Sequence, residues 1–518
     1  MNYPADKFNY LVLVFAAALV ISIFSRFSSD ASGIQATLCF IMGAALFFNI
    51  NAYSLKFKKH TLPLLLFMLV AVFSYYHSDF RYNARNGIFL LSYCGCAYLL
   101  SSFLKAYDKR SILLIPVFIS LWLTIFLFAT NITFSGLLEP QILSKTMRAT
   151  AGFLVLALCL SFAFWWTERK IYTYTSFIIF GAILLTKSYY CAALASAAFA
   201  VFLFFMRDKL KIKPAVAILP FVALSSSAFY LAFKTGYFAS KMPLWQTAAS
   251  VIKDNFVLGT GFCNYQTVSE FYTKLPGVDM AQSDNLFLQL FAETGIAGLL
   301  LFISMLLVFF ILIFKKLRVK ENKTLYFPVL LSVIFFISVN MFESCAFIST
   351  NMLVLFIVLA FPADEVEVVK RKRKIINTYI AILMLLPLIY AFALPLLANE
   401  DYKKGIMFFA AGKYTVSEDY FLSAINRDAQ NPDFTSKLSD TYFAMRQGEN
   451  SGLLLDKAIA YKQFALSLNR YEGKYYYDLA WMYHAKGDKI LASENIIKAL
   501  EMDKFNEHFN DSYGALIY

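Results

Sequence analysis

Residues Ser240–Phe262 read S-K-M-P-L-W-Q-T-A-A-S-V-I-K-D-N-F-V-L-G-T-G-F, and residues Ala281–Gly298 read A-Q-S-D-N-L-F-L-Q-L-F-A-E-T-G-I-A-G. Mostly polar and aromatic residues lie between them, and an apolar helix is predicted to run on to Phe314. Both flanks of the stretch are strongly apolar. A polar segment of this length cannot lie in lipid, because its backbone N–H and C=O groups would lack hydrogen-bond partners there. We therefore expect it at the water face of a membrane helix bundle, where loops carry functional side chains.

The composition points to the same class of protein. Of the 518 residues, 59% are hydrophobic and 16% are charged, and the mean hydropathy is +0.59. A soluble protein cannot cover that much apolar surface, whereas a protein that crosses the membrane many times requires it. The seven cysteines lie before residue 346, mostly in apolar segments. We expect no disulfide framework, no metal site and no cofactor.

The apolar segments predict an all-α, polytopic membrane helix bundle. A spanning helix needs roughly 20 apolar residues, and the chain holds about thirteen candidates, within a range of 12 to 14. Their centres lie near Phe15, Met42, Leu69, Leu91, Leu121, Leu156, Phe180, Ala197, Ala223, Met305, Phe335, Leu355 and Leu385. The bundle is predicted to occupy residues 1–398, with a large outer loop at 234–283.

Lys and Arg alternate between the connections as the positive-inside rule describes. With a cytoplasmic N-terminus, the inner connections hold 23 of these residues, and the outer ones hold ten, four of them in the loop at 234–283. The net charge of +13 is therefore a signal of topology, and no nucleic-acid partner is expected. This alternation places the loop and the C-terminal region outside the cytoplasm, in the periplasm of a bacterial inner-membrane protein.

Residues 399–518 form a second predicted domain, because acidic residues become frequent and long apolar runs stop. The segments that begin at Ala465 and Ala499 align at a distance of 34 residues, the tetratricopeptide period. Gly412, Gly448 and Gly487 mark turns between paired helices. We expect a tetratricopeptide-like α-solenoid of about three helix pairs that docks an envelope protein.

Cations near the predicted outer face are candidates to bind a diphosphate. They are Arg81, Arg85, Arg148, Lys187 and Lys241. Guanidinium and ammonium groups pair with phosphate oxygens through charge-assisted hydrogen bonds. The alternative is that these side chains extend to the membrane interface and bind nothing.

A carboxylate at a helix start is the candidate for catalysis. Asp284 and Asn285 precede the apolar helix, so Asp284 is either its N-cap or a general base that takes a proton from an acceptor hydroxyl. Gly259 and Gly261 are expected to shape the loop. Glu293 is expected to hydrogen-bond inside the bundle. No nucleotide-binding loop or zinc motif is present in the sequence.

The run W-x7-K-D-N-x3-G-T-G-F, followed by S-D-N-L-F-L-Q-L-x2-E-T-G-I-A-G, resembles the shared region of WaaL-type O-antigen ligases, Wzy-type polymerases and O-oligosaccharyltransferases. The resemblance implies that Trp245 matches the family tryptophan and that Lys241 stands at the usual arginine. Lys187-Ser188-Tyr189 matches an outer S-R pattern of the family, with tyrosine in the arginine position. Asp284 stands where the ligases carry histidine, and the S-D-N version is closer to some polymerases. The resemblance adds Trp245 and Asn285 to the predicted substrate-binding residues.

The predicted function is glycan transfer from a polyprenyl diphosphate carrier to an acceptor hydroxyl, with Asp284 as base and Lys241, Arg148 and Lys187 holding the diphosphate. Membrane lipids surround the enzyme, and the acceptor is a glycan, a lipid A core or a protein. Two alternatives remain. A transporter or flippase of lipid-linked sugars is expected to show internal repeats and helices broken at the midplane, which the sequence does not reveal. A membrane scaffold would use the repeat domain alone.

Overall fold

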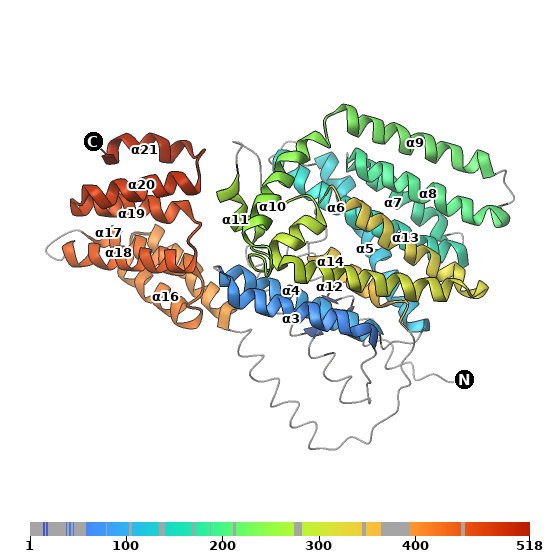
Figure 1. Ribbon diagram of the computed structural model, residues 1–518, viewed down its shortest axis with the longest axis horizontal. Helices are drawn as coiled ribbons and strands as arrows, with labels where there is room; N and C mark the ends of the chain where they lie inside the picture. Colours follow the sequence, from blue (N-terminus) through green and yellow to red (C-terminus); the bar gives the residue numbers. More distant parts are fainter. Residues whose placement is uncertain are drawn as a thin grey trace, which may run out of the picture.

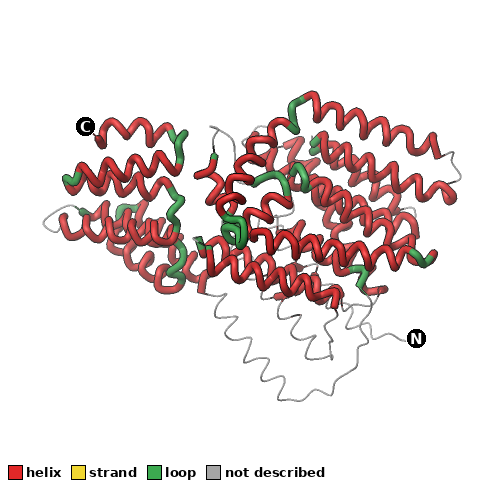
Figure 2. The backbone as a smooth tube through the Cα atoms, viewed as in Figure 1, coloured by secondary structure: helices red, strands yellow, loops and turns green. Residues whose placement is uncertain are grey.

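The computed structural model describes residues 59–78, 80–102, 106–133, 140–167, 171–186, 188–210, 214–273, 282–343, 349–363, 394–446 and 451–517, and single positions between 14 and 45. Within these residues every regular element is a helix, as Figure 2 shows. The all-α prediction is therefore confirmed for the part of the chain that is described.

The bundle helices follow the predicted apolar segments (Figure 1). They are α3 (Leu62–His77), α4 (Arg81–Ser102), α5 (Ala106–Thr133), α6 (Pro140–Thr167), α7 (Ile171–Leu185), α8 (Tyr189–Leu210), α9 (Pro214–Lys234), α12 (Leu286–Leu317), α13 (Lys323–Val339) and α14 (Ser349–Ala360). Each of these contains one predicted span centre. Phe15 and Met42 are helical and buried, whereas the centre near Leu385 lies outside the described residues.

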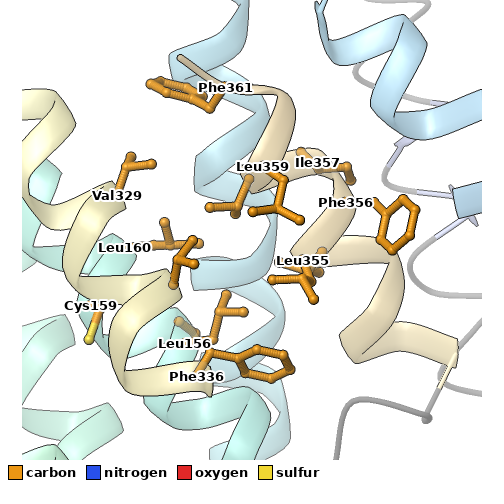
Figure 3. Packing of buried hydrophobic residues seen from close by; sticks show 14 of the residues in the cluster. Leu156, Cys159, Leu160, Val329, Phe336, Leu355, Phe356, Ile357, Leu359 and Phe361 are labelled. Atoms are coloured by element: carbon orange, nitrogen blue, oxygen red, sulfur yellow. The ribbon is translucent and has the colours of Figure 1, made fainter. Parts of the chain in front are cut away.

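Helix α6 forms the middle of the bundle. All its residues from Ala151 to Phe164 are buried, and α5, α7, α8 and α13 pack around it. Figure 3 shows side chains of α6, α13 and α14 in one apolar cluster, among them Leu156, Phe336 and Leu355. A helix that is apolar on every side is stable only when neighbours cover it, and the sequence of α6 is of that kind.

The outside of the bundle is apolar as well, which identifies a membrane protein. Phe233 on α9, Leu69 on α3 and Leu307 on α12 are among the large apolar side chains exposed on the bundle. Exposed apolar surface on this scale marks contact with lipid or another protein. By length and composition, three described helices are able to cross a membrane, or four if α9 and its bent continuation count as one span. Five shorter apolar helices accompany them in the described part of the chain.

The C-terminal region is a stack of helices in chain order, coloured orange to red in Figure 1. It begins with a helix over 394–410 and continues with α16 (Tyr414–Arg427), α17 (Pro432–Met445), α18 (Ser451–Leu468), α19 (Gly473–Lys486), α20 (Lys489–Met502) and α21 (Glu507–Ile517). From α16 onward, each helix packs on the next. Gly412 and Gly487 lie at turns with positive φ, as predicted, whereas Gly448 lies outside the described residues. The tetratricopeptide assignment itself stays a prediction.

Candidate active site

The loop that begins after α9 is folded against a break in α12. It contains η2 (Ala239–Lys241), α10 (Met242–Asp254) and α11 (Tyr265–Tyr272). Gly295 has φ 67° and ψ −173°, so the helical hydrogen bonds stop there. The loop supplies the missing partners. Thr260 N–H donates to the Ala292 carbonyl and Gly261 N–H to the Glu293 carbonyl, both at 2.9 Å.

Three glycines make this contact sterically feasible. A Cβ on Gly295 would collide with the backbone of Val257, and a Cβ on Gly259 would collide with the backbone of Glu293. Gly259 and Gly261 also have positive φ, at 70° and 106°. Only glycine adopts such angles without strain. The expectation that Gly259 and Gly261 shape the loop is confirmed, and their partner is the E-T-G break of α12.

Glu293 also stabilises the contact between the loop and the break in α12. It forms hydrogen bonds inside the bundle, as expected from the sequence. It is 1% exposed; its carboxylate accepts hydrogen bonds from Cys263 N–H at 3.0 Å and Gln289 Nε2 at 3.2 Å. The break in α12 was not expected from the sequence. A broken helix is one mark of a transporter, the alternative considered above. Here the freed carbonyls of Ala292 and Glu293 bond to the loop backbone, so the break serves to hold the loop.

Asp284 and Lys241 meet in the space between the loop and α12. Lys241 Nζ lies 2.6 Å from Asp284 Oδ2, and the Lys241 side chain is 4% exposed while that of Asp284 is 20% exposed. The lysine is also 4.9 Å from the centre of the Tyr237 ring, which stabilises its charge. Lys241 and Asp284, which lie 43 positions apart in the sequence, thus form one cation–carboxylate pair, in which the carboxylate is the more exposed group.

The N-cap of α12 is Asn285, which corrects one of the two roles considered for Asp284. The Asn285 side chain accepts hydrogen bonds from Phe287 N–H and Leu288 N–H and donates to the Met341 carbonyl at 3.2 Å. Asp284 stands one residue earlier, with φ 51°. Its carboxylate is therefore directed to Lys241 rather than to the helix end, because Asn285 already satisfies the first N–H groups.

A second carboxylate, Glu343, lies in the same region and was missed by the sequence analysis. It follows α13 and is 3% exposed. Its Oε1 accepts from Tyr237 OH at 2.8 Å and Ser188 Oγ at 2.9 Å, and its Oε2 accepts from Cys191 Sγ at 3.3 Å. Burial raises the pKa of Glu343, and these hydrogen bonds and the Lys241 charge oppose that rise. A glutamate at the end of an apolar segment is the signal that could have identified it.

Glu343 and the side chains that donate hydrogen bonds to it are here called the Glu343 cluster. Trp245 lies next to this cluster through an aromatic contact. Its ring centre lies 5.6 Å from that of Phe342, which in turn packs edge-on to Phe238 and Tyr190. These rings cover the side of the Glu343 cluster. Trp245 is thus close to the Glu343 cluster, and its role in substrate binding stays a prediction. Among the described residues, no group of three or more His, Cys, Asp and Glu side chains is arranged to hold a metal ion.

The other predicted cations are not brought together with Lys241 by the contacts that the structure describes. Lys187 lies outside the described residues, and of Arg148 only the backbone, in α6, is described. Arg81 is exposed at the first position of α4. Arg85 forms a bidentate pair with Asp428 of the C-terminal region, with Nη1–Oδ1 at 2.8 Å and Nη2–Oδ2 at 2.7 Å. The terminal nitrogens expected to hold phosphate are bound to a carboxylate of the same chain.

We call the contacts between bundle and C-terminal region the tail junction. Besides Arg85 and Asp428, it contains the hydrogen bond from Tyr75 OH to Gln430 Oε1 at 3.2 Å. The Phe271 and Tyr471 rings add a contact at 5.9 Å. Tyr471 also packs on the apolar cluster that joins α10, α11 and α12. The tail junction therefore ties the C-terminal helix stack to the loop that carries Lys241.

The tail junction gives a test of what Arg85 does. Arg85→Ala and Asp428→Ala are each expected to loosen the tail by about 3–5 kcal/mol, because each leaves a largely buried charge without its partner. The exchange Arg85→Asp with Asp428→Arg is expected to restore much of the loss. Limited proteolysis of the purified protein in nanodiscs, read at the tail, measures this. If Arg85 instead contacts the donor, Arg85→Ala reduces glycan transfer while Asp428→Ala leaves both transfer and proteolysis unchanged.

Comparison with known proteins agrees with the resemblance seen in the loop. Residues 99–303 match the family model described as O-Antigen ligase (Wzy_C). This stretch contains Lys241, Trp245, Asp284, Asn285 and the break of α12, whereas Glu343 and the tail lie beyond it. No curated protein matches the chain.

Among solved structures, the first tetratricopeptide domain of Spaghetti (RPAP3) bound to the HSP90 peptide SRMEEVD is similar at 20% identity. That match covers 24% of this chain and 94% of the other, with a TM-score of 0.22, which does not establish a shared fold. The family match, with the apolar helices, supports a multi-pass membrane protein with a glycan-transferring function of the ligase or polymerase kind. Over residues 99–303 the chain is thus similar to the O-antigen ligase family.

Proposed function

We propose that this protein moves an oligo- or polysaccharide from a polyprenyl diphosphate carrier to an acceptor hydroxyl at the outer face of the bacterial inner membrane. The observation that carries the proposal is the pair of Lys241 Nζ and Asp284 Oδ2 at 2.6 Å. One group is suited to bind the leaving diphosphate and the other to accept a proton, and both belong to the stretch that matches the O-antigen ligase family. The acceptor is a glycan, a lipid A core or a protein hydroxyl.

The resting pair also supports an order of events. A donor diphosphate carries more negative charge than a carboxylate, so it competes for the Lys241 ammonium. Its arrival frees Asp284, which then accepts the proton of the acceptor hydroxyl. The acceptor oxygen attacks the anomeric carbon with inversion, the bond from that carbon to the diphosphate oxygen breaks, and the diphosphate leaves with the electron pair. Lys241 stabilises the developing charge.

Removal of the Lys241 charge tests this proposal. Lys241→Met keeps most of the volume of a side chain that is 4% exposed. It is expected to weaken the use of donor by about 1.5–3 kcal/mol, or roughly 10- to 150-fold. Lys234→Met is the matched control, because Lys234 ends α9 and is exposed. Donor turnover in membranes with equal amounts of each protein is the measurement, and equal turnover by Lys241→Met and wild type would reduce Lys241 to a structural residue.

The proposed orientation places the loop and the tail in the periplasm. It is supported by the distribution of Lys and Arg and by the tail junction, which requires both on one side of the membrane. In a background without native cysteines, cysteines at the exposed positions Gln266 of α11 and Lys457 of α18 are expected to react with an impermeant maleimide in cells with a permeable outer membrane. Reaction only after the inner membrane is broken would reverse the orientation.

A further inference from the structure

Glu343 joins three elements that surround Lys241. Through Ser188 it holds the start of α8, through Tyr237 it holds the turn between α9 and η2, and its own backbone continues from the end of α13. These elements are far apart in sequence: Ser188 lies 155 positions and Tyr237 lies 106 positions from Glu343. The Glu343 carboxylate therefore connects the start of α8, the turn before η2 and the end of α13.

We propose that Glu343 is a positioning residue for the donor diphosphate, which it serves by holding Tyr237 against Lys241 and by anchoring the start of α8 through Ser188. This inference rests on the proposed function. It adds a residue that lies outside the stretch matched by the family and that does not itself touch the reacting atoms.

The link to Lys241 passes through the Tyr237 ring. The Tyr237 hydroxyl is bound to Glu343 Oε1 at 2.8 Å, and the Lys241 ammonium lies 4.9 Å from the centre of the same ring. The ring also stacks on Tyr190 at 5.9 Å, and Tyr190 OH donates to the Ser338 carbonyl at 2.7 Å. The ring position is thus fixed at its hydroxyl and on one face, so the ammonium on it is held where Asp284 and a diphosphate can both reach it.

A second link from Glu343 passes through Ser188, at the start of α8. Ser188 Oγ donates to Glu343 and accepts from Cys191 N–H at 3.2 Å, which fixes the first turn of α8. Loss of the carboxylate would free this hydroxyl and the one on Tyr237 at the same time. The Tyr237 ring beside Lys241 and the start of α8 would then both lose a constraint.

The surroundings of Glu343 favour positioning over proton transfer. Three groups already donate to its two oxygens, and the residue is 3% exposed, so an acceptor hydroxyl has no direct route to it. Within the described part of the chain, the charged or titratable groups around it are Tyr190, Tyr237, Cys191 and Lys241, and Lys241 in turn pairs with Asp284. The Asp284 side chain is 20% exposed, so it is more accessible to an acceptor hydroxyl than Glu343 is.

The test compares Glu343→Ala, Glu343→Gln and Tyr237→Phe in proteoliposomes. The donor is carrier-linked glycan extracted from a strain that lacks the gene, and its concentration is varied to measure KM. Glu343→Ala is expected to raise the donor KM by about 10- to 100-fold and to change kcat by less than about threefold. Glu343→Gln is expected to remain within about threefold of wild type, because its amide oxygen still accepts from Tyr237 and Ser188. Tyr237→Phe keeps the ring and is expected to raise the donor KM by about 3- to 10-fold.

The double variant Glu343→Ala with Tyr237→Phe is expected to be no worse than Glu343→Ala, because both changes remove the same link. If Glu343→Ala does not accumulate, Glu343→Gln and Tyr237→Phe carry the test alone. A turnover rate lowered by about two orders of magnitude or more in Glu343→Gln, with an unchanged KM, would overturn positioning in favour of proton transfer. An unchanged KM in Tyr237→Phe and Glu343→Ala would also overturn it. Failure of the proposed function is distinct, since the wild type itself would then not turn over the donor.

Discussion

Asp284→Asn is expected to lower glycan transfer by roughly 10²- to 10⁴-fold while the protein accumulates in the membrane at its normal level. Asparagine has the shape of aspartate but no basic oxygen of comparable strength. It also adopts positive φ more readily than most residues, and Asp284 has φ 51°. The cap of α12 is untouched, because Asn285 provides it. The measurement is transfer of labelled glycan in isolated membranes, normalised to the amount of protein.

Three further variants separate the base from a structural role for Asp284. Asp284→Gly keeps the backbone conformation and is expected to be as inactive as Asp284→Asn. Asp284→Ala adds strain of roughly 1–2 kcal/mol from the left-handed backbone. Asp284→His places a different base next to Asn285 and is expected to retain part of the activity. Near-normal transfer by Asp284→Asn and Asp284→Gly would leave Asp284 as an ion-pair partner of Lys241 and nothing more.

Gly295→Ala is expected to have the largest effect on stability. The residue has φ 67° in the middle of α12, and a Cβ there would collide with the backbone of Val257. Left-handed strain alone costs roughly 1–2 kcal/mol, and the collision separates the loop from the break. Since the loop carries Lys241, we expect little protein in the membrane and no transfer from what remains.

Gly181→Ala is the matched control for this change. Gly181 lies in α7, and a Cβ there would meet nothing within 4 Å. Alanine in a helix interior is expected to be neutral or to stabilise by roughly 0.5–1 kcal/mol. Thermal unfolding and membrane abundance of the two variants are compared side by side. Equal abundance of Gly295→Ala and Gly181→Ala would show that the break of α12 is not required for the fold.

Much of the bundle was predictable because lipid imposes a simple rule on sequence. The apolar segments around Leu156, Ala197 and Phe335 became α6, α8 and α13, since only helices satisfy their own backbone in a membrane. The loop motif was predictable in part. Glycines in G-T-G indicated close backbone approach, yet the partner in E-T-G was not apparent, because a break inside an apolar helix leaves no mark other than Gly295.

The site was predictable only where its residues belong to the motif. Lys241 and Asp284 were both predicted as site residues from the sequence. Their direct contact was not, because it depends on how the loop folds against α12. The cap was misplaced by one residue, because Asp and Asn are equally good caps and backbone angles decide between them. Glu343 and the Arg85–Asp428 pair escaped detection for a different reason. Their partners lie more than 100 positions away, and no local pattern reports such contacts.

The pool of carrier-linked glycan in cells tests the central claim most directly. In a strain that lacks the gene, mass spectrometry of the lipid extract is expected to show accumulation of polyprenyl diphosphate-linked glycan. The wild-type gene is expected to clear it, and the Asp284→Asn gene, at equal protein level, is expected to leave it in place. An unchanged pool of carrier-linked glycan in the deletion strain would contradict the claim that this protein uses the carrier-linked glycan as its donor.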